Sequence, residues 1–226
     1  MDRTQTTSRA PRTFWAKTFN AVLDRSRRWL GIGVYGIYTR PLAPPQHSEP
    51  DMPDFAHRIY EQRDAEALLA QAKRPELEMS ETFVRRALAK GDACGAILYK
   101  NEIVSYGWLA FSPTHHSEGV YVDFGENDRY GYKGLTLQEF RGRHLRRLFN
   151  HFNDPYCMAR GRTHVIAFVD LGNNASIRHM TAMGQRRIGF AGFLKRGRLF
   201  IPFATAAVRR HGFRFCVPRG APAETN

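Results

Sequence analysis

The chain has 226 residues, 42% of them hydrophobic, and a net charge of +13. This length suits one sizeable hydrophobic core with an appended segment and is too short for two full domains. The apolar runs hold only a handful of residues, so we expect no membrane-spanning helix, and the polar, basic start lacks the apolar region of a secretory signal. The charge favours an anionic partner, such as nucleic acid, a phosphate-rich cofactor or an anionic membrane face, or it reflects a solvated basic surface.

The cysteine and histidine pattern argues against disulfides and against a bound metal. The cysteines Cys94, Cys157 and Cys216 are widely separated, and no CxxC pair occurs. His115 and His116 are adjacent but have no further ligands at metal-site spacing. We therefore expect reduced thiols, a cytoplasmic location and no metal site.

The start of the chain predicts an amphipathic helix. Over residues 14–30, FWAKTFNAVLDRSRRWL, apolar side chains recur at helical spacing with basic side chains largely between them. Such a helix either docks on the protein core or lies on an anionic membrane surface, which would place the protein peripherally at the inner membrane face. We divide the chain into an N-terminal extension (1–33), a main domain (34–213) and a flexible C-terminal tail (214–226).

The first half of the main domain predicts a strand, two helices and a hairpin. Residues 34–42 are rich in aromatic and β-branched side chains, which favours a strand, and a proline-rich loop follows. One helix begins at Asp64 and runs to about Ala72, and Ser80 caps the next helix. Two apolar runs joined by a short polar turn predict the hairpin over residues 91–111.

The second half predicts alternating strands and helices after a loop over residues 112–120. The continuous apolar run at residues 163–170 indicates a strand that is buried on both faces. Another strand is expected within residues 121–128, and the next one begins at Gly131 and ends near Leu137. Two further strands are expected at 186–194 and 198–203. The helices are expected at residues 143–152 and 174–183. This order predicts a mixed α/β fold with a β-α-β crossover near its middle.

The stretch GYKGLTLQEFRGRHLRRLF, residues 131–149, has the parts of an anion-binding site. A strand that ends in a glycine turn and enters a helix exposes free backbone N–H groups at the positive end of the helix dipole. Gly142 would let the backbone approach a phosphate, and the neighbouring arginines would attract it. The stretch lacks the Walker and dinucleotide-binding patterns. An ordinary exposed basic helix is the alternative interpretation.

The same stretch resembles the acyl-CoA-binding motif of the GNAT acyltransferase superfamily, in which a strand ending in T-x-P-E-Y-R-G-R-G-L enters a helix. The matching residues are Thr136, Glu139, Phe140, Arg141, Gly142, Arg143 and Leu145. A second segment, VDLGNNASIRHMTAMGQRRIG, is similar to the family's later strand and helix. Its matching residues are Asn174, Ser176, Gly184 and Gly189. The resemblance covers residues 55–203 and implies a mixed, central twisted sheet flanked by helices.

The resemblance further implies an acyl-CoA-dependent N-acyltransferase. Such an enzyme moves an acetyl or other acyl group from its CoA thioester to an amine of a small molecule, here an amino sugar or an amino acid derivative. Backbone groups near Leu135, Thr136 and Leu137 would bind the pantetheine arm and polarise the thioester carbonyl. The helix start would hold the diphosphate, through Arg141, Gly142, Arg143, His144, Leu145 and Arg146. Asn174 would face the pantetheine or cap its helix.

The sequence departs from the family pattern at positions that matter for the chemistry. His144 stands where a glycine is usual, and Met180 stands where many members carry the tyrosine that acts as general acid. Methionine has no proton to donate. The main candidates for proton transfer are therefore Tyr132 and Ser176. Further candidates are His179, Glu126 and Asp128, and each of these five residues also has an ordinary explanation in packing, capping or surface solvation.

Other classes of function stay open at this point. Loss of the general acid would leave a GNAT-fold binding or accessory protein without turnover. The charge alone would also suit a basic membrane-surface or nucleic-acid-binding protein. A nucleic-acid partner is not expected, because the sequence lacks zinc-finger spacing and the aromatic pattern of RNA-recognition motifs.

Overall fold

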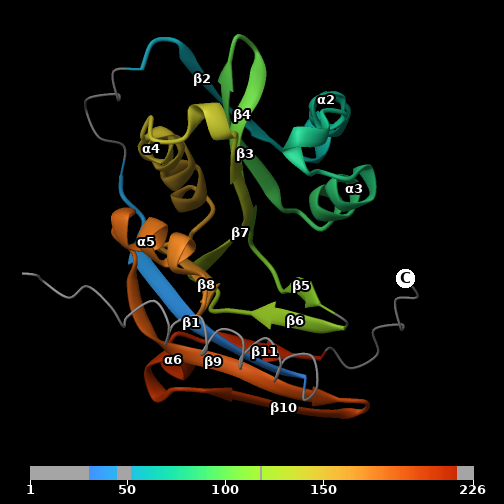
Figure 1. Cartoon of the computed structure of the whole chain (residues 1–226), viewed down its shortest axis with the longest axis vertical. Helices are drawn as coiled ribbons and strands as arrows, with labels where there is room; N and C mark the ends of the chain where they lie inside the picture. Colours follow the sequence, from blue (N-terminus) through green and yellow to red (C-terminus); the bar gives the residue numbers. More distant parts are fainter. Residues whose placement is uncertain (1–30, 45–51, 118, 218–226) are drawn as a thin grey trace, which may run out of the picture.

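The computed structural model describes residues 31–44, 52–117 and 119–217. In this part of the chain an eight-stranded sheet has the order β10-β9-β1-β8-β7-β4-β3-β2, and a small sheet has the order β11-β6-β5 (Figure 1). The large sheet consists of β1 (Ile32–Pro41), β2 (Phe55–Tyr60), β3 (Ala93–Tyr99), β4 (Glu102–Ala110), β7 (Asp128–Thr136), β8 (His164–Asp170), β9 (Arg186–Arg196) and β10 (Leu199–Ala204). The small sheet consists of β5 (Thr114–Ser117), β6 (Val120–Asp123) and β11 (Arg214–Cys216).

Helices cover both faces of the large sheet. They are α2 (Ala65–Ala72), α3 (Glu81–Ala89), α4 (Leu145–Met158), α5 (Asn174–Ala182) and the short α6 (Ala206–Arg210). Helices α2 and α3 lie together on one side of the sheet, and α4 lies on the other (Figure 1). Strands β3 and β4 are buried over almost their whole length because helices cover them from both sides. The mixed α/β fold expected from the sequence is confirmed.

Among the described strands, one pair is parallel. Strands β7 and β8 are parallel, and α4 forms the crossover between them, as the alternation of elements predicted. The other pairs of the large sheet are antiparallel. Strand β1 lies between β8 and β9, so the first described strand joins the sheet among the last ones.

Two hydrophobic clusters make up the core. One packs α2, α3 and α4 against β3 and β4 and includes Tyr106 and Trp108, which are 1% and 0% exposed. The other lies around β1, β8 and the small sheet and includes Ile37, Phe213 and Phe215. Burying a large apolar side chain contributes on the order of 2 kcal/mol, so these clusters dominate the stability of the fold.

Several expected boundaries are wrong. Residues 114–117 form β5 within the expected loop, and β2, α6 and β11 were not expected at all. The tail expected at 214–226 begins with β11, where Phe215 is 1% exposed in the second cluster. These elements are short, and β2 and β11 form by pairing with strands that are distant in the sequence. The helix predicted over residues 14–30 lies outside the described residues. Within the described part, no helix is long and apolar enough to cross a membrane.

Two helix starts also differ from expectation. Helix α4 begins at Leu145 rather than near residue 143, because His144 is its N-cap with a left-handed backbone (φ of +56°). Helix α5 is capped by Asn173 instead of Asn174. The Asn173 side-chain oxygen accepts a hydrogen bond of 3.0 Å from the Ser176 amide, which satisfies one free N–H group of the first turn.

Candidate active site

A cleft opens where the two parallel strands separate. Strands β7 and β8 pair only between residues 128–130 and 164–166. Beyond these pairs β7 continues along β4, and its edge toward β8 makes no further ladder bonds in the described part of the chain. The gap forms part of a cleft of about 750 Å³ whose walls come from β7, β8, α4 and α5. Strand edges without a partner offer N–H and C=O groups to a ligand.

A bulge shapes the β7 wall of this cleft. Lys133 has a positive φ of 42°, and the register with β4 shifts between Tyr106 and Trp108. The cleft is lined by residues 129–134 of β7, and residues 135–137 lie beyond its lining. The pattern Gly-Tyr-Lys-Gly in the sequence is the signal that could have located the bulge, because glycines inside a strand often mark one.

Several groups of residues 135–137, expected to bind the pantetheine and polarise the thioester, are engaged with β4. The Leu137 amide donates to Val104 O over 2.9 Å, and Leu135 pairs with Tyr106 of β4. The Thr136 hydroxyl is 2.8 Å from the Ser105 hydroxyl. The β7 residues that line the cleft therefore lie at and before the bulge, directly ahead of the expected residues 135–137.

The start of α4 is open. Residues 141–144, His144 included, are all exposed. Gly142 has a φ of +78°, a conformation that favours glycine, and no side chain caps the helix. Arg141 bonds back to Thr136 O over 3.1 Å, and Arg143 lies over the Phe140 ring. The expected strand, turn and helix with uncapped amides are present.

Arg146 does not point out at this bend. Its guanidinium lies against β4 and β7, where Nη2 donates to Tyr106 O over 3.1 Å and the group stacks on Phe149. A Cβ atom on Gly107 or Gly134 would lie 3.0 Å or 2.6 Å from its terminal nitrogens, so both glycines make room for it. Burial, and then the positive charge of Arg129, lower the pKa of Arg146 to about 10, and it stays charged at neutral pH.

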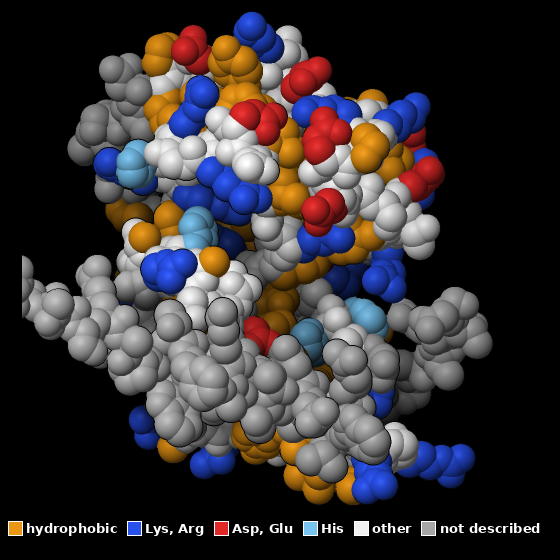
Figure 2. Space-filling view, viewed as in Figure 1, with side chains coloured by type: hydrophobic (Ala, Val, Ile, Leu, Met, Phe, Trp, Pro, Cys, Tyr) orange, Lys and Arg blue, Asp and Glu red, His pale blue; other side chains and the backbone are white. Residues whose placement is uncertain are grey.

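The cleft is electrically one-sided. Among the described residues, its lining includes cations and no aspartate or glutamate. These cations are Arg129, Lys133, Arg141 and Arg146. Lysine and arginine side chains also gather over α4 on the face shown in Figure 2. A concave surface of one sign concentrates ligands of the opposite sign, so the cleft suits an anionic ligand.

The proton-carrying side chains of the cleft come from β7 and α5. Tyr132 lines the cleft, but its hydroxyl donates to Asp92 Oδ2 over 2.6 Å, and Lys90 pairs with the other oxygen of Asp92 at 2.6 Å. Burial and then the Asp92 charge raise the pKa of Tyr132 far above its usual value. This hydroxyl therefore keeps its proton and directs it at Asp92.

Ser176 and His179 line the cleft from α5, three residues apart and so on one helix face. Desolvation against the cleft wall and the positive charge of Arg146 lower the pKa of His179, so its imidazole is neutral at pH 7 and can accept a proton. Met180 also lines the cleft. A neutral base and a hydroxyl therefore share this wall with a side chain that has no proton to give.

The remaining sequence candidates lie away from this wall. Asn173 lines the cleft, whereas Asn174 does not. Asp128 is 5% exposed at the start of β7, where burial raises its pKa against the nearby charges of His164 and His211. Glu126 precedes the strand, and its carbonyl accepts a hydrogen bond from Arg162. The structure thus brings Tyr132, Ser176, Arg141 and Arg146 together and leaves the carboxylates outside.

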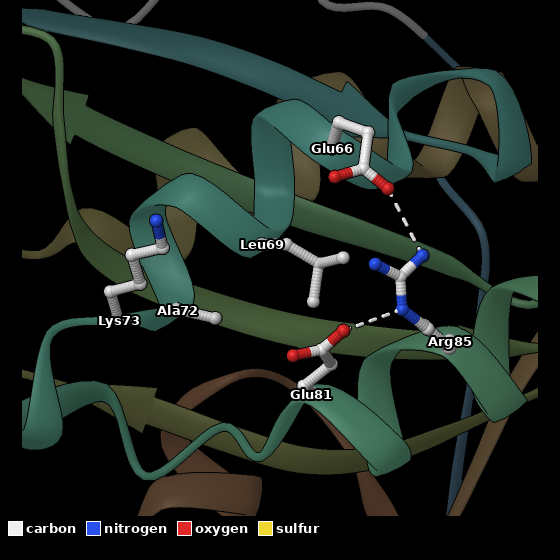
Figure 3. Close-up of a pocket in the computed structure, with 6 residues that line it drawn as sticks. All are labelled: Glu66, Leu69, Ala72, Lys73, Glu81 and Arg85. Carbon is white, nitrogen blue, oxygen red and sulfur yellow. Dashed lines mark hydrogen bonds and ion pairs between the residues drawn. The ribbon is translucent and has the colours of Figure 1, made fainter.

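A second, separate hollow of about 440 Å³ lies between α2 and α3 (Figure 3). Arg85 is held between Glu66 and Glu81, at 3.0 Å and 2.8 Å, while Leu69 and Ala72 contribute apolar surface. Its charged groups are largely paired within it and exposed to water, where such pairs contribute little energy. This groove lacks the surplus charge that distinguishes the cleft.

Comparison with known proteins gives similarities of fold only. No protein-family model and no curated protein sequence matches the chain. Similar solved structures include a GNAT-family acetyltransferase from Colwellia psychrerythraea (11% identity, TM-score 0.45, covering 76% of this chain and 56% of that one). A GCN5-related N-acetyltransferase from Kribbella flavida has 10% identity and a TM-score of 0.45, covering 81% and 63%. A tandem GNAT protein from the clavulanic acid biosynthesis pathway has 12% identity and a TM-score of 0.47, covering 87% and 57%.

The chain spans 56% to 63% of the length of these three proteins.

Proposed function

We propose that the protein is an acyl-CoA-dependent N-acyltransferase that uses a small-molecule amine as acceptor. The observation that carries this proposal is the cleft itself, which lies between two separating parallel strands, has only cations among its charged lining residues, and adjoins an uncapped helix start. These features together suit a long ligand with phosphates at one end and amide groups along its arm.

The residues present fit acyl-CoA. The exposed amides after Gly142 and the side chains of Arg141 and Arg143 would hold the diphosphate at the start of α4. The edge of β7 that faces β8 would bond the amides of the pantetheine arm. When bound, the thioester supplies an activated acyl group whose carbonyl carbon is open to attack by an amine.

The side chains of α5 would handle the protons of this transfer. The amine nitrogen attacks the thioester carbonyl, so that a C–N bond forms while the C–S bond breaks and the electron pair leaves with sulfur. His179, neutral at pH 7, would accept the proton that the amine loses, and the Ser176 hydroxyl would donate toward the departing thiolate. Tyr132 would serve to hold Asp92 instead of transferring protons, since its hydroxyl is already committed.

A second candidate function is binding without turnover. Met180 in the cleft and the commitment of the Tyr132 hydroxyl to Asp92 favour it, because they leave fewer groups to protonate a leaving thiolate. Under this alternative the protein binds acyl-CoA but releases no free thiol in the presence of amines.

The test combines calorimetry with a thiol-release assay. Titration of the full chain with acetyl-CoA should show saturable binding that Arg141→Ala weakens about tenfold, the effect of one charge-assisted contact of about 1.5 kcal/mol. Arg63→Ala is the matched control, because it removes the same charge from a side chain that is 83% exposed in a different part of the fold.

Thiol release with a panel of amino sugars and amino acid derivatives should then depend on α5. We expect His179→Gln to lower kcat at least a hundredfold at pH 7 and Ser176→Ala to lower it by a smaller factor. Binding without thiol release for any amine would favour the second candidate, and absence of binding would refute both.

A further inference from the structure

Two arginines that line the cleft, Arg129 and Arg146, have little acidic compensation among the described residues. Arg40 makes two hydrogen bonds to the Asp154 carboxylate, at 2.6 Å and 3.0 Å, and Arg129 lies 3.7 Å from the same carboxylate. Arg146 is near enough to Arg129 for its pKa to be lowered by that charge. The guanidinium groups of Arg40 and Arg129 therefore share one carboxylate, and no ion pair joins Arg146 to a carboxylate in the described part of the chain.

Arg146 is the member of this group that lines the cleft and has no carboxylate of its own. Within the described residues its hydrogen-bonding partner is a neutral one, the Tyr106 carbonyl, which Nη2 contacts. Its Nε atom is buried and has no hydrogen-bond partner. A guanidinium has five N–H donors, so most of the binding capacity of this side chain is unused.

The Arg146 guanidinium lies at a different place from the proposed diphosphate site. The bend at residues 141–144 is exposed, whereas the Arg146 guanidinium lies inward, over Gly107 and Gly134 beside the β7 bulge. The two glycines leave room for the planar group at this place, and Phe149 stacks on it from α4. A charged group that is fixed by stacking and a carbonyl bond is pre-organised for a planar anion.

An uncompensated buried cation is expensive, and a ligand that carries the opposite charge removes that cost. A carboxylate is the anion whose planar geometry matches a guanidinium, with two parallel N–H···O bonds. The described residues contribute no carboxylate to the cleft lining, so a bound ligand is the natural source of the counter-charge.

We propose that Arg146 forms a subsite for a carboxylate carried by one of the two substrates. This inference rests on the proposed acyl transfer. The carboxylate belongs either to the far end of a dicarboxylic acyl group or to an amino acid acceptor. Both sources present the same group to Arg146, and substrate pairs that differ only in that group distinguish them.

The experiment compares kcat/KM for two matched pairs. Succinyl-CoA and butyryl-CoA have acyl chains of equal carbon number, and an amino acid and its amide have the same amine. We expect the wild-type chain to favour the charged member of one pair by about 10- to 100-fold, the effect of a charge-assisted hydrogen bond of 1.5–3 kcal/mol. Preference in the acyl pair assigns the carboxylate to the acyl group, and preference in the acceptor pair assigns it to the acceptor.

The variants Arg146→Gln and Arg146→Lys test the residue itself. Glutamine should abolish the preference, and lysine should retain part of it, because lysine keeps the charge and loses the planar fork. Arg178→Gln, on the exposed face of α5 and outside the cleft lining, is the control that should keep the preference. Thermal unfolding of each variant establishes that it is folded before its kinetics are compared.

Three results would overturn the subsite. The first is an equal rate for both members of each pair in the wild type. The second is a preference that survives Arg146→Gln. The third is an equal loss for all four substrates, together with weaker binding of free CoA, which would assign Arg146 to the diphosphate. If the wild type binds free CoA and transfers acyl groups without these preferences, only the subsite fails. If it does not bind CoA at all, the proposed function fails with it.

Discussion

The buried carboxylate of Asp154 offers the sharpest prediction about the stability of the fold. It lies on α4, is 1% exposed, and accepts hydrogen bonds from Arg40 of β1 and from the Ala43 amide, the latter over 3.1 Å. Arg129 of β7 is also within ion-pair distance, at 3.7 Å. One carboxylate thus joins a helix to two strands that are not adjacent in the sheet.

The substitution Asp154→Asn keeps the size of the side chain and removes its charge. Arg40 and Arg129 then have no buried counter-charge, and breaking a buried pair in this way typically costs about 3–5 kcal/mol. Domains of this size unfold with a free energy of about 5–15 kcal/mol, so the variant should lose a large fraction of its stability. The double variant with Arg40→Met should lose less than the sum of the single losses, because it also removes one of the stranded charges.

Urea unfolding, monitored by circular dichroism, tests this prediction. The midpoint of Asp154→Asn should fall while the dependence of free energy on urea stays the same, since the surface exposed on unfolding does not change. A loss below about 1 kcal/mol for the single variant, or strict additivity in the double variant, would refute the reasoning.

Three further predictions concern the pH response, the α4 start and the role of Tyr132. His57 stacks on Phe152, and burial lowers its pKa to about 4. The pKa of histidine in the unfolded chain is about 6.5, so stability that is present above pH 6.5 is lost as the pH falls toward 4. Between pH 7 and pH 4 the free energy of unfolding of His57→Phe should therefore fall by about 2 kcal/mol less than that of the wild type. The same pH dependence of this free energy in both proteins would contradict the prediction. His144→Gly should raise the free energy of unfolding by up to about 1 kcal/mol, because glycine tolerates the positive φ; an unchanged or lower urea midpoint would count against the left-handed N-cap. Tyr132→Phe should cost about 1–2 kcal/mol of stability, since Asp92 loses a donor, while turnover changes less than tenfold; a hundredfold fall in kcat in a folded variant would return Tyr132 to a catalytic role.

The sequence was most informative where the pattern is local. The Ser80 cap is confirmed by its 3.3 Å bond from the Phe83 amide, and the apolar run before Asp170 forms β8 as predicted. These features depend on neighbours within a few residues, such as a capping side chain or an uninterrupted apolar strand. The turn at Gly142 was located for the same reason, because only glycine readily adopts its φ.

The cleft was less accessible to sequence reasoning because its key contacts are distant in the chain. Nothing near Arg146 in the sequence indicates that its guanidinium lies on Gly107 and Gly134, and the commitment of Tyr132 to Asp92 joins residues 40 positions apart. The cap of α5 was displaced by one residue because consecutive asparagines have equal propensity, and the hydrogen bond to Ser176 decides between them.

The structure of the full chain with bound acetyl-CoA tests the central claim most directly. The account predicts the diphosphate at the exposed amides after Gly142 and the thioester in the gap between β7 and β8, with His179 on the same wall. A ligand seated in the groove between α2 and α3, or a cleft that stays empty at saturating acetyl-CoA, would contradict it.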